Sequence, residues 1–516
     1  MTAALLTIAL FLLPGLLFFQ KKDFDRLPCI IGLSLSYWIS SFWVLKYIPI
    51  PLHMFVFFSL ALSFILSLKG RWHVSVGTLL WFLLLAIPGI VVFSRQIAPA
   101  GADMSMHAYL AKVIYLRDGF PTTLRPLVPL DQFGKYPIGF PTIIADMMLV
   151  NGLPVYTNAL LLSVFTYWFF AASLFALLRT RFPFIISALT TLLVVWTSVT
   201  TNDIIEWGAN PTVLSLGFLI IALTVRRPIL VLVSISTAIF LHYMLPVALL
   251  YFPLLFVAPG VLSFANGHLG LDPFALRYVW GLHQQELIEW SGIGNPIRFI
   301  QNTLGAHFFF LYLAALAILI FRRSRSIWVH GLSVAGIGIL ILNAQHWWLP
   351  LSPVLYPKRV VLLLLIPASV AIAEVLTSMA KRRVMLVIGA MLLALMLRER
   401  VTVSVRNFVD SGRFSTVTHD DLTAFAWLAA NTTPNDVVLN TYHDAGLWIP
   451  AIAERQITTY HTNPIDMEKL GNNIGKETYV YRGAKSLAPQ TTAVPIDYEL
   501  VFSSGEAKVY KVPKSR

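Results

Sequence analysis

SRQIAPAGADMSMHAYLAKVIYLRDGFPTTLRPLVPLDQFGKYPIGFP, residues 94–141, is the polar interruption around which the rest of the chain is organised. It separates long apolar runs with almost no acidic side chains, and it carries Asp103 and His107 in a segment that predicts a helix. A spacing of four residues places the carboxylate and the imidazole on one helix face. We therefore expect the remaining chain to hold this segment in place.

The composition indicates a polytopic membrane protein. The 516 residues are 57% hydrophobic and 12% charged, with a mean hydropathy of +0.73. The formal net charge of +13 comes from short basic clusters between apolar runs, which orient a membrane protein and argue against nucleic-acid binding. Cys29 is the single cysteine, so an internal disulfide and a cysteine zinc cluster are both excluded.

The apolar runs predict about twelve transmembrane helices, because each is long enough to cross about 30 Å of hydrocarbon. They lie at 2–19, 28–48, 52–68, 75–94, 154–178, 183–200, 211–225, 229–255, 304–321, 327–343, 360–376 and 384–398. The region 229–258 contains Pro246, so one kinked span and two short spans both remain open. The first run lacks a basic start and a small-residue cleavage site, and we interpret it as a retained span.

Basic residues mark alternate loops as cytoplasmic, beginning with the loops at 20–26 and 69–74. This pattern places the N-terminus and a large loop at 95–153 on the periplasmic side of a bacterial inner membrane. We expect residues 1–398 to form the transmembrane domain and residues 399–516 a small periplasmic α/β domain. In that domain the sequence predicts a helix from Asp420, a turn at 433–435 and strands at 437–440, 457–461 and 506–512.

Asp103 is the main catalytic candidate, with His107 as its neighbour. Glycosyl transfer to an alcohol requires a base that removes the acceptor proton, and a partly desolvated carboxylate can do this. The alternative is that Asp103 only caps the helix that follows it.

Other polar groups occur in the segments assigned to the periplasmic face. Lys358 and Arg359 could hold a phosphate at headgroup depth, although contact with lipid headgroups is the alternative. Tyr136 precedes a proline where the chain returns to the membrane, where an interfacial tyrosine is also expected. The further substrate-binding candidates are Asp203, Glu206, His346 and Tyr356, and we consider His242, His283, Arg298 and His307 more typical of structural roles.

Several motifs resemble the integral-membrane glycosyltransferases of the GT-C superfamily, and in particular a bacterial branch of multi-spanning proteins of largely unassigned role. They are LLPGLL at 12–17, GADMSMHAY at 101–109, YPIGFP at 136–141, EWGANP at 206–211, YPKRVVLLLLIP at 356–367 and FAWLAANTTPNDVVLNTYHDAGLWIPAIAERQ at 425–456. Residues 442–446, YHDAG, occupy the place of the Trp-Trp-Asp-Tyr-Gly sequence of oligosaccharyltransferases, with two of five residues shared.

The resemblance implies an inverting transferase that uses a sugar on a polyprenyl phosphate and a periplasmic glycan, lipid or protein acceptor. It also implies that an acid of the first large loop acts as base or metal ligand, and Asp103 matches that position. Mg²⁺ or Mn²⁺ would be the metal, but Asp103 lacks an adjacent acid, and a hard cation prefers several oxygen ligands.

Two other functions remain open beside this transferase. One is a ligase or polymerase that moves a preassembled lipid-linked glycan. The other is a lipid or glycan transporter without chemistry, which predicts ionisable residues along an intramembrane path. Asp146 and Glu374 are nearly the only acids within or near the predicted spans, and this argues against a proton-coupled carrier.

Overall fold

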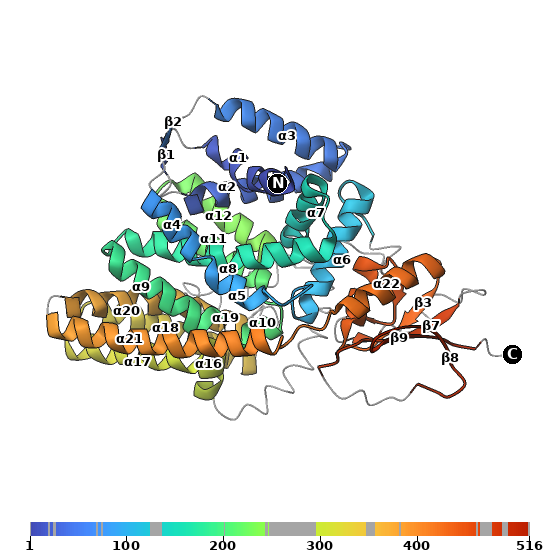
Figure 1. Ribbon diagram of the computed structural model, residues 1–516. Helices are drawn as coiled ribbons and strands as arrows, with labels where there is room; N and C mark the ends of the chain where they lie inside the picture. The colour runs from blue at the N-terminus through green and yellow to red at the C-terminus, as the bar shows by residue number, and fades with distance from the viewer. Residues whose placement is uncertain are drawn as a thin grey trace.

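The protein is described by a computed structural model, in which a helical body carries a small sheet domain at its C-terminal end (Figure 1). The structure describes residues 2–18, 21–23, 27–68, 71–73, 76–123, 137–200, 202–242, 246, 296–346, 357–380, 383–460, 463–464, 477–487 and 494–513. This confirms a mainly helical chain with a C-terminal sheet.

The helices of the N-terminal half are α1 (Thr2–Leu16), α2 (Leu27–Leu45), α3 (Leu52–Ser67), α4 (Val76–Leu84), α5 (Ile87–Phe93), α6 (Ala102–Arg117), α7 (Gly139–Asn151), α8 (Val155–Arg179), α9 (Phe184–Val194), α10 (Asn202–Glu206), α11 (Asn210–Thr224) and α12 (Pro228–His242). Those that follow are α16 (Pro296–Leu304), α17 (Ala306–Phe321), α18 (Ile327–His346), α19 (Pro357–Val361), α20 (Leu365–Ala380), α21 (Arg383–Ser404), α22 (His419–Asn431) and α23 (Ile449–Ile452). The π-helical turns η2 (Val195–Val199) and η5 (Val405–Asp410) extend α9 and α21.

Each predicted span overlaps a helix in the described residues, but most of these helices are short. Within the described ranges, three helical stretches are long and apolar enough to cross a membrane: Leu27–Leu45, Val155–Arg179 and Lys358–Met379. A fourth is formed if α16 and α17, which meet at a bend of 113°, are counted as one span. Pro88 begins a new helix within the apolar run 75–94, which is therefore divided into α4 and α5. The count of twelve spans stays a prediction.

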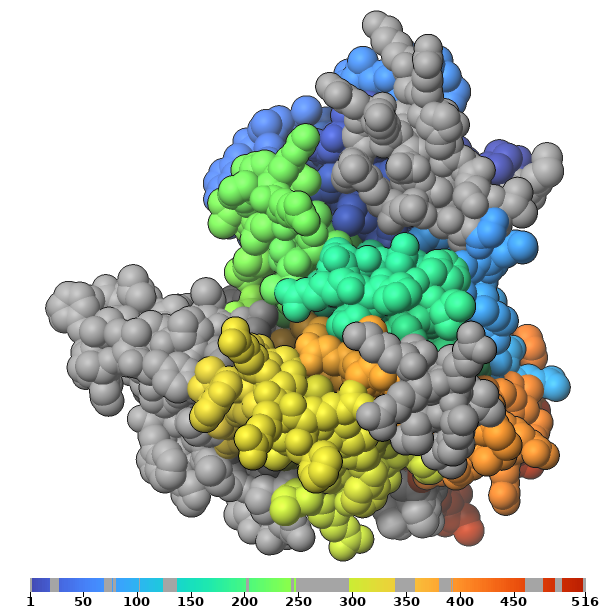
Figure 2. All heavy atoms as spheres, turned by 90° about the vertical axis from the view of Figure 1, so that its left-hand side faces the viewer, coloured from blue at the N-terminus to red at the C-terminus, as the bar shows by residue number. Residues whose placement is uncertain are grey.

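Helix α8 lies at the centre of the helical body and contacts α5, α7, α9 and α11. Its aromatic residues Tyr167, Phe169 and Phe170 are fully buried. Helix α20 contacts α9 on one side and α17 and α18 on the other. Figure 2 shows this face, with the segment that follows residue 357 (orange) between α9 (teal) and the helices that follow residue 296 (yellow).

Two parts of the predicted loops are ordered by backbone contacts. In the first, β1 (Lys21–Asp23) pairs in parallel with β2 (Arg71–His73), so two basic loops assigned to one membrane face lie side by side. In the second, residues 139–151, within the predicted large loop, form the buried helix α7, which packs against α1, α2 and α8. The second half of that loop therefore belongs to the helical core.

The sheet domain contains β3 (Val437–Leu439), β4 (Gln456–Ile457), β7 (Thr478–Arg482), β8 (Glu499–Ser504) and β9 (Ala507–Lys511), in the order β4-β3-β7-β9-β8. Strand β3 is parallel to β4 and β7, whereas β9 is antiparallel to β7 and β8. A short hairpin pairs β5 (Thr459–Tyr460) with β6 (Asn463–Pro464). The predicted helix and the three predicted strand regions are confirmed. Helix α21 and η5 continue to Asp410, so the first residues of the predicted domain 399–516 are helical.

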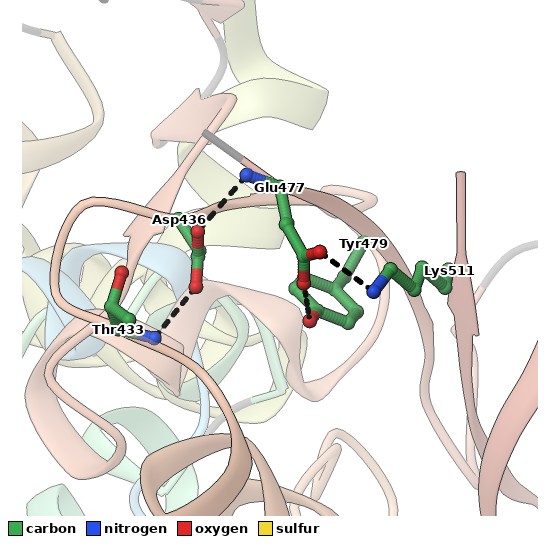
Figure 3. A network of polar contacts seen from close by, with 5 residues as sticks. All are labelled: Thr433, Asp436, Glu477, Tyr479 and Lys511. Atoms are coloured by element: carbon green, nitrogen blue, oxygen red, sulfur yellow. Dashed lines mark hydrogen bonds and ion pairs between the residues drawn. The ribbon is translucent and has the colours of Figure 1, made fainter. Parts of the chain in front are cut away.

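A polar network joins the predicted turn at 433–435 to the sheet (Figure 3). The carboxylate of Asp436 accepts hydrogen bonds from the backbone amides of Thr433, at 2.6 Å, and of Glu477, at 3.0 Å. The Glu477 carboxylate accepts from the Tyr479 hydroxyl and the Lys511 ammonium, each at 2.7 Å. These contacts hold the turn that precedes β3 against β7 and β9.

Candidate functional site

Asp103 is the second residue of α6, in its first turn, and the N-cap residue is Gly101. Gly101 has a φ of +92°, and a Cβ atom there would lie 2.2 Å from the backbone nitrogen of Gly208. Gly208, with a φ of +72°, would in turn direct a Cβ to 2.8 Å from Cγ of Met104. Only glycine permits this approach, so the GAD and EWGANP motifs contact each other through their backbones.

The capping alternative for Asp103 is resolved by this geometry. Gly101 occupies the N-cap, and no side chain makes the cap hydrogen bond there. The Asp103 carboxylate instead accepts a hydrogen bond of 2.8 Å from Nη2 of Arg359, which lies 256 positions later in α19. Both side chains are 14% exposed, so the pair is partly desolvated and its charge attraction is stronger than at the surface.

Two histidines complete this cluster, which we call the Asp103–Arg359 cluster and define as Asp103, His107, His242 and Arg359. Nη1 of Arg359 contacts Nε2 of His242, at the end of α12. His107 is 1% exposed, and its ring packs edge-on against Phe140 with centroids 5.3 Å apart. Asp103 and His107 both act electrostatically on His242. Three helices distant in sequence thus bring four ionisable groups together.

Lys358, next to Arg359, extends the basic side of the site. Its Nζ lies 4.7 Å from the ring centroid of Trp207, within the range of a cation–π interaction. Because Trp207 precedes Gly208, the loop that contacts Gly101 also supports Lys358. Two cations are therefore held beside one carboxylate.

The structure brings some of the predicted site residues together and leaves others undecided. Asp103 and Arg359 form an ion pair, His107 acts electrostatically on the same His242 that Arg359 contacts, and Lys358 precedes Arg359 in the chain. Glu206 ends α10 and is exposed in a separate pocket. The side chains of Asp203 and His346 and the whole of Tyr136, Tyr356 and His283 lie outside the described residues.

The residues of this site do not fit a divalent cation. Among the residues that the structure describes, no group of three or more histidine, cysteine or acidic side chains could hold a metal ion. The partner of Asp103 is a guanidinium, whereas Mg²⁺ or Mn²⁺ would need further oxygen ligands. We therefore derive no step through a metal.

Sequence reasoning missed three features of the site. His242 was assigned a structural role, Trp207 was not considered, and the close contact of Gly101 with Gly208 was not expected. The glycines were the available signal in the sequence, because GAD and EWGANP each contain a glycine two positions from an acidic residue.

The sheet domain contacts the helix that carries Asp103. Helix α23 and the short helix η6 (Ala445–Trp448) pack against α6, and Nζ of Lys112 lies 2.8 Å from Oε1 of Glu454. Asp444, in the YHDAG segment, is 1% exposed and accepts hydrogen bonds from the backbone amides of Gly446 and Gly483. Its carboxylate therefore supports the domain itself.

Comparisons with known proteins give similarity to solved structures but not to a family model or a curated protein. No family model matches the chain, and no curated protein matches it. Among solved structures, the chain is similar to the crystal structure of an oligosaccharyltransferase from Archaeoglobus fulgidus in complex with zinc and sulfate. The sequence identity is 11%, the TM-score is 0.40, and the similarity covers 78% of this chain and 67% of that one.

Proposed function

We propose that this protein is a membrane glycosyltransferase of the GT-C type that transfers a sugar from a polyprenyl-phosphate donor to a hydroxyl acceptor on the periplasmic side of a bacterial inner membrane. The ion pair of Asp103 with Arg359 is the observation that carries the proposal. It joins a carboxylate suited to act as base to a guanidinium suited to bind phosphate, beside apolar helices that a lipid chain could contact.

In this proposal Arg359 and Lys358 bind the donor phosphate. The guanidinium offers a planar fork that matches phosphate oxygens, and the Lys358 ammonium adds a point charge. When phosphate binds Arg359, it competes with the Asp103 carboxylate for the same N–H groups. The carboxylate then turns to the acceptor hydroxyl, so donor binding prepares the base.

The chemical step is a displacement at the anomeric carbon. The bond from this carbon to the phosphate oxygen breaks as the bond to the acceptor oxygen forms. Asp103 takes the acceptor proton, and polyprenyl phosphate leaves as an anion stabilised by Arg359 and Lys358. Attack on the face opposite the phosphate inverts the anomeric centre, and His107 orients Asp103 or the acceptor.

The test is sugar transfer by the purified full chain in lipid nanodiscs, with a radiolabelled polyprenyl-phosphate monosaccharide. Asp103→Asn should lower transfer by at least about a hundredfold, the usual contribution of a general base. Asp118→Asn, at the end of the same helix, is the matched control and should transfer normally. Full transfer by Asp103→Asn would remove Asp103 from the mechanism.

The same assay separates the two alternative functions. Activity only with an oligosaccharide-diphosphate donor would favour a glycan ligase or polymerase. Movement of either donor across the membrane without sugar transfer would favour a transporter.

A further inference from the structure

A polar pocket lies between α10, α16, α21 and η5. Its volume is about 360 Å³, within the range of small-molecule sites of roughly 300–1,000 Å³. The residues that line it with polar side chains include Glu206, Gln301, Asn302, Arg400, Ser404 and Asn407. They come from three separate regions of the chain, so the pocket exists only in the folded protein.

The lining favours a neutral ligand that carries hydroxyl groups. Gln301, Asn302 and Asn407 each offer an amide with both donors and an acceptor, and a sugar hydroxyl can satisfy either. The two charged residues, Glu206 and Arg400, have opposite signs, so the pocket does not favour an anion such as phosphate.

Two elements connect the wall of the pocket to the Asp103–Arg359 cluster. Glu206 precedes Trp207, which lies under Lys358, and Gly208, which contacts Gly101. Helix α16 provides Gln301 and contacts both α10 and α19, the helix that carries Arg359. The wall of the pocket therefore shares α10 and α16 with the elements that support the cluster.

We propose that this pocket binds the acceptor as a neutral sugar, with the amides of α16 and η5 recognising its hydroxyl groups and Glu206 and Arg400 orienting it towards Asp103. The inference rests on the transferase function proposed above, for which it supplies the chemical class of the acceptor. Donor and acceptor then bind at different places: Lys358 and Arg359 bind the donor phosphate, and the pocket binds the acceptor.

Saturation-transfer difference NMR tests this binding directly. The full chain in nanodiscs is mixed with a panel of methyl hexosides, without any lipid donor. At least one methyl hexoside should receive saturation, and its binding should weaken roughly tenfold in Gln301→Leu and in Asn302→Leu, since each variant loses a hydrogen-bonding amide. Asn302 is exposed, so Asn302→Leu should fold even if Gln301→Leu does not. Thr402→Leu, exposed on α21 and outside the pocket lining, is the matched control and should bind as the wild type does.

The outcomes separate this inference from the proposed function. Asp103→Asn should keep hexoside binding while it loses transfer. If no methyl hexoside receives saturation from the wild type, or if Gln301→Leu and Asn302→Leu bind like Thr402→Leu, the acceptor pocket is refuted. If the hexoside binds as expected but Asp103→Asn still transfers sugar, the pocket stands and the role of Asp103 fails.

Discussion

Arg359 donates a hydrogen bond of 2.8 Å from Nη2 to Oδ2 of Asp103, although the two residues are 256 positions apart in sequence. The same guanidinium contacts His242 through Nη1. The planar guanidinium of Arg359 therefore joins α6, through Asp103, to α12, through His242. The consequences of this and of other contacts can be measured.

Arg359→Lys should lower transfer even though the charge is retained. A lysine ammonium cannot reach His242 and Asp103 with two separate N–H groups in one plane. The loss should be about 1–3 kcal/mol, or roughly fivefold to 150-fold in kcat/KM. Arg413→Lys, at an exposed arginine outside the site, is the matched control and should transfer as the wild type does. Equal transfer by Arg359→Lys and the wild type would show that the fork is unimportant.

Gly101→Ala should reduce transfer at least about tenfold, because its Cβ must push Gly208 away and displace Asp103. Gly152→Ala is the control, since Gly152 also has a positive φ, +68°, but no atom lies within 4 Å of the added Cβ. It should cost only the backbone strain of about 1–2 kcal/mol and leave transfer intact. Thermal melting and sugar-transfer rates are measured for Gly101→Ala and Gly152→Ala. An equal loss of transfer in the two variants would show that the contact of Gly101 with Gly208 does not cause the loss.

Arg455→Met should destabilise the sheet domain by on the order of 3 kcal/mol. Arg455 is 6% exposed, and its guanidinium donates hydrogen bonds to the carbonyl oxygens of Ala429 and Thr432 at the end of α22. Without the guanidinium of Arg455, the carbonyl oxygens of Ala429 and Thr432 lose these hydrogen bonds. Hydrogen exchange of α22 in the full chain measures the loss. The exposed Arg413→Met is the control, and protection of α22 that is equal in both variants would contradict the expectation.

The sheet domain should lose stability with rising pH through Asp444. Burial raises the pKa of this carboxyl above its usual 3.8, so the folded domain binds the proton more tightly than the unfolded chain. The stabilising contribution is complete below the usual pKa and disappears as pH rises through the raised one. Relative to Asp444→Asn, which does not titrate, the wild type should lose at most about 1.4 kcal/mol per pH unit in that window. Hydrogen exchange of the β7 amides, measured at several pH values, gives the pH dependence of the domain's stability. If the wild type and Asp444→Asn show the same pH dependence, the raised pKa of Asp444 is contradicted.

Much of the fold follows from local sequence patterns. The apolar runs predicted where helices lie, and the run from Asp420 to Asn440 predicted a helix, a turn and a strand, because capping and alternation act over a few residues. Helix α7 was missed because the Pro-Gly-Pro pattern at its start indicated a loop. Its burial against α1, α2 and α8 overrides that local signal.

The sequence by itself determined a helical, strongly apolar chain, its C-terminal sheet domain and the set of polar residues available for chemistry. Only the tertiary structure decided that Arg359 contacts Asp103, that His242 joins them and that Trp207 supports Lys358. The physical reason is that these contacts link helices far apart in the chain, and their distances are set by packing. Gly101 and Gly208 illustrate this, since each is an ordinary loop residue in sequence and a point of backbone contact in the folded protein.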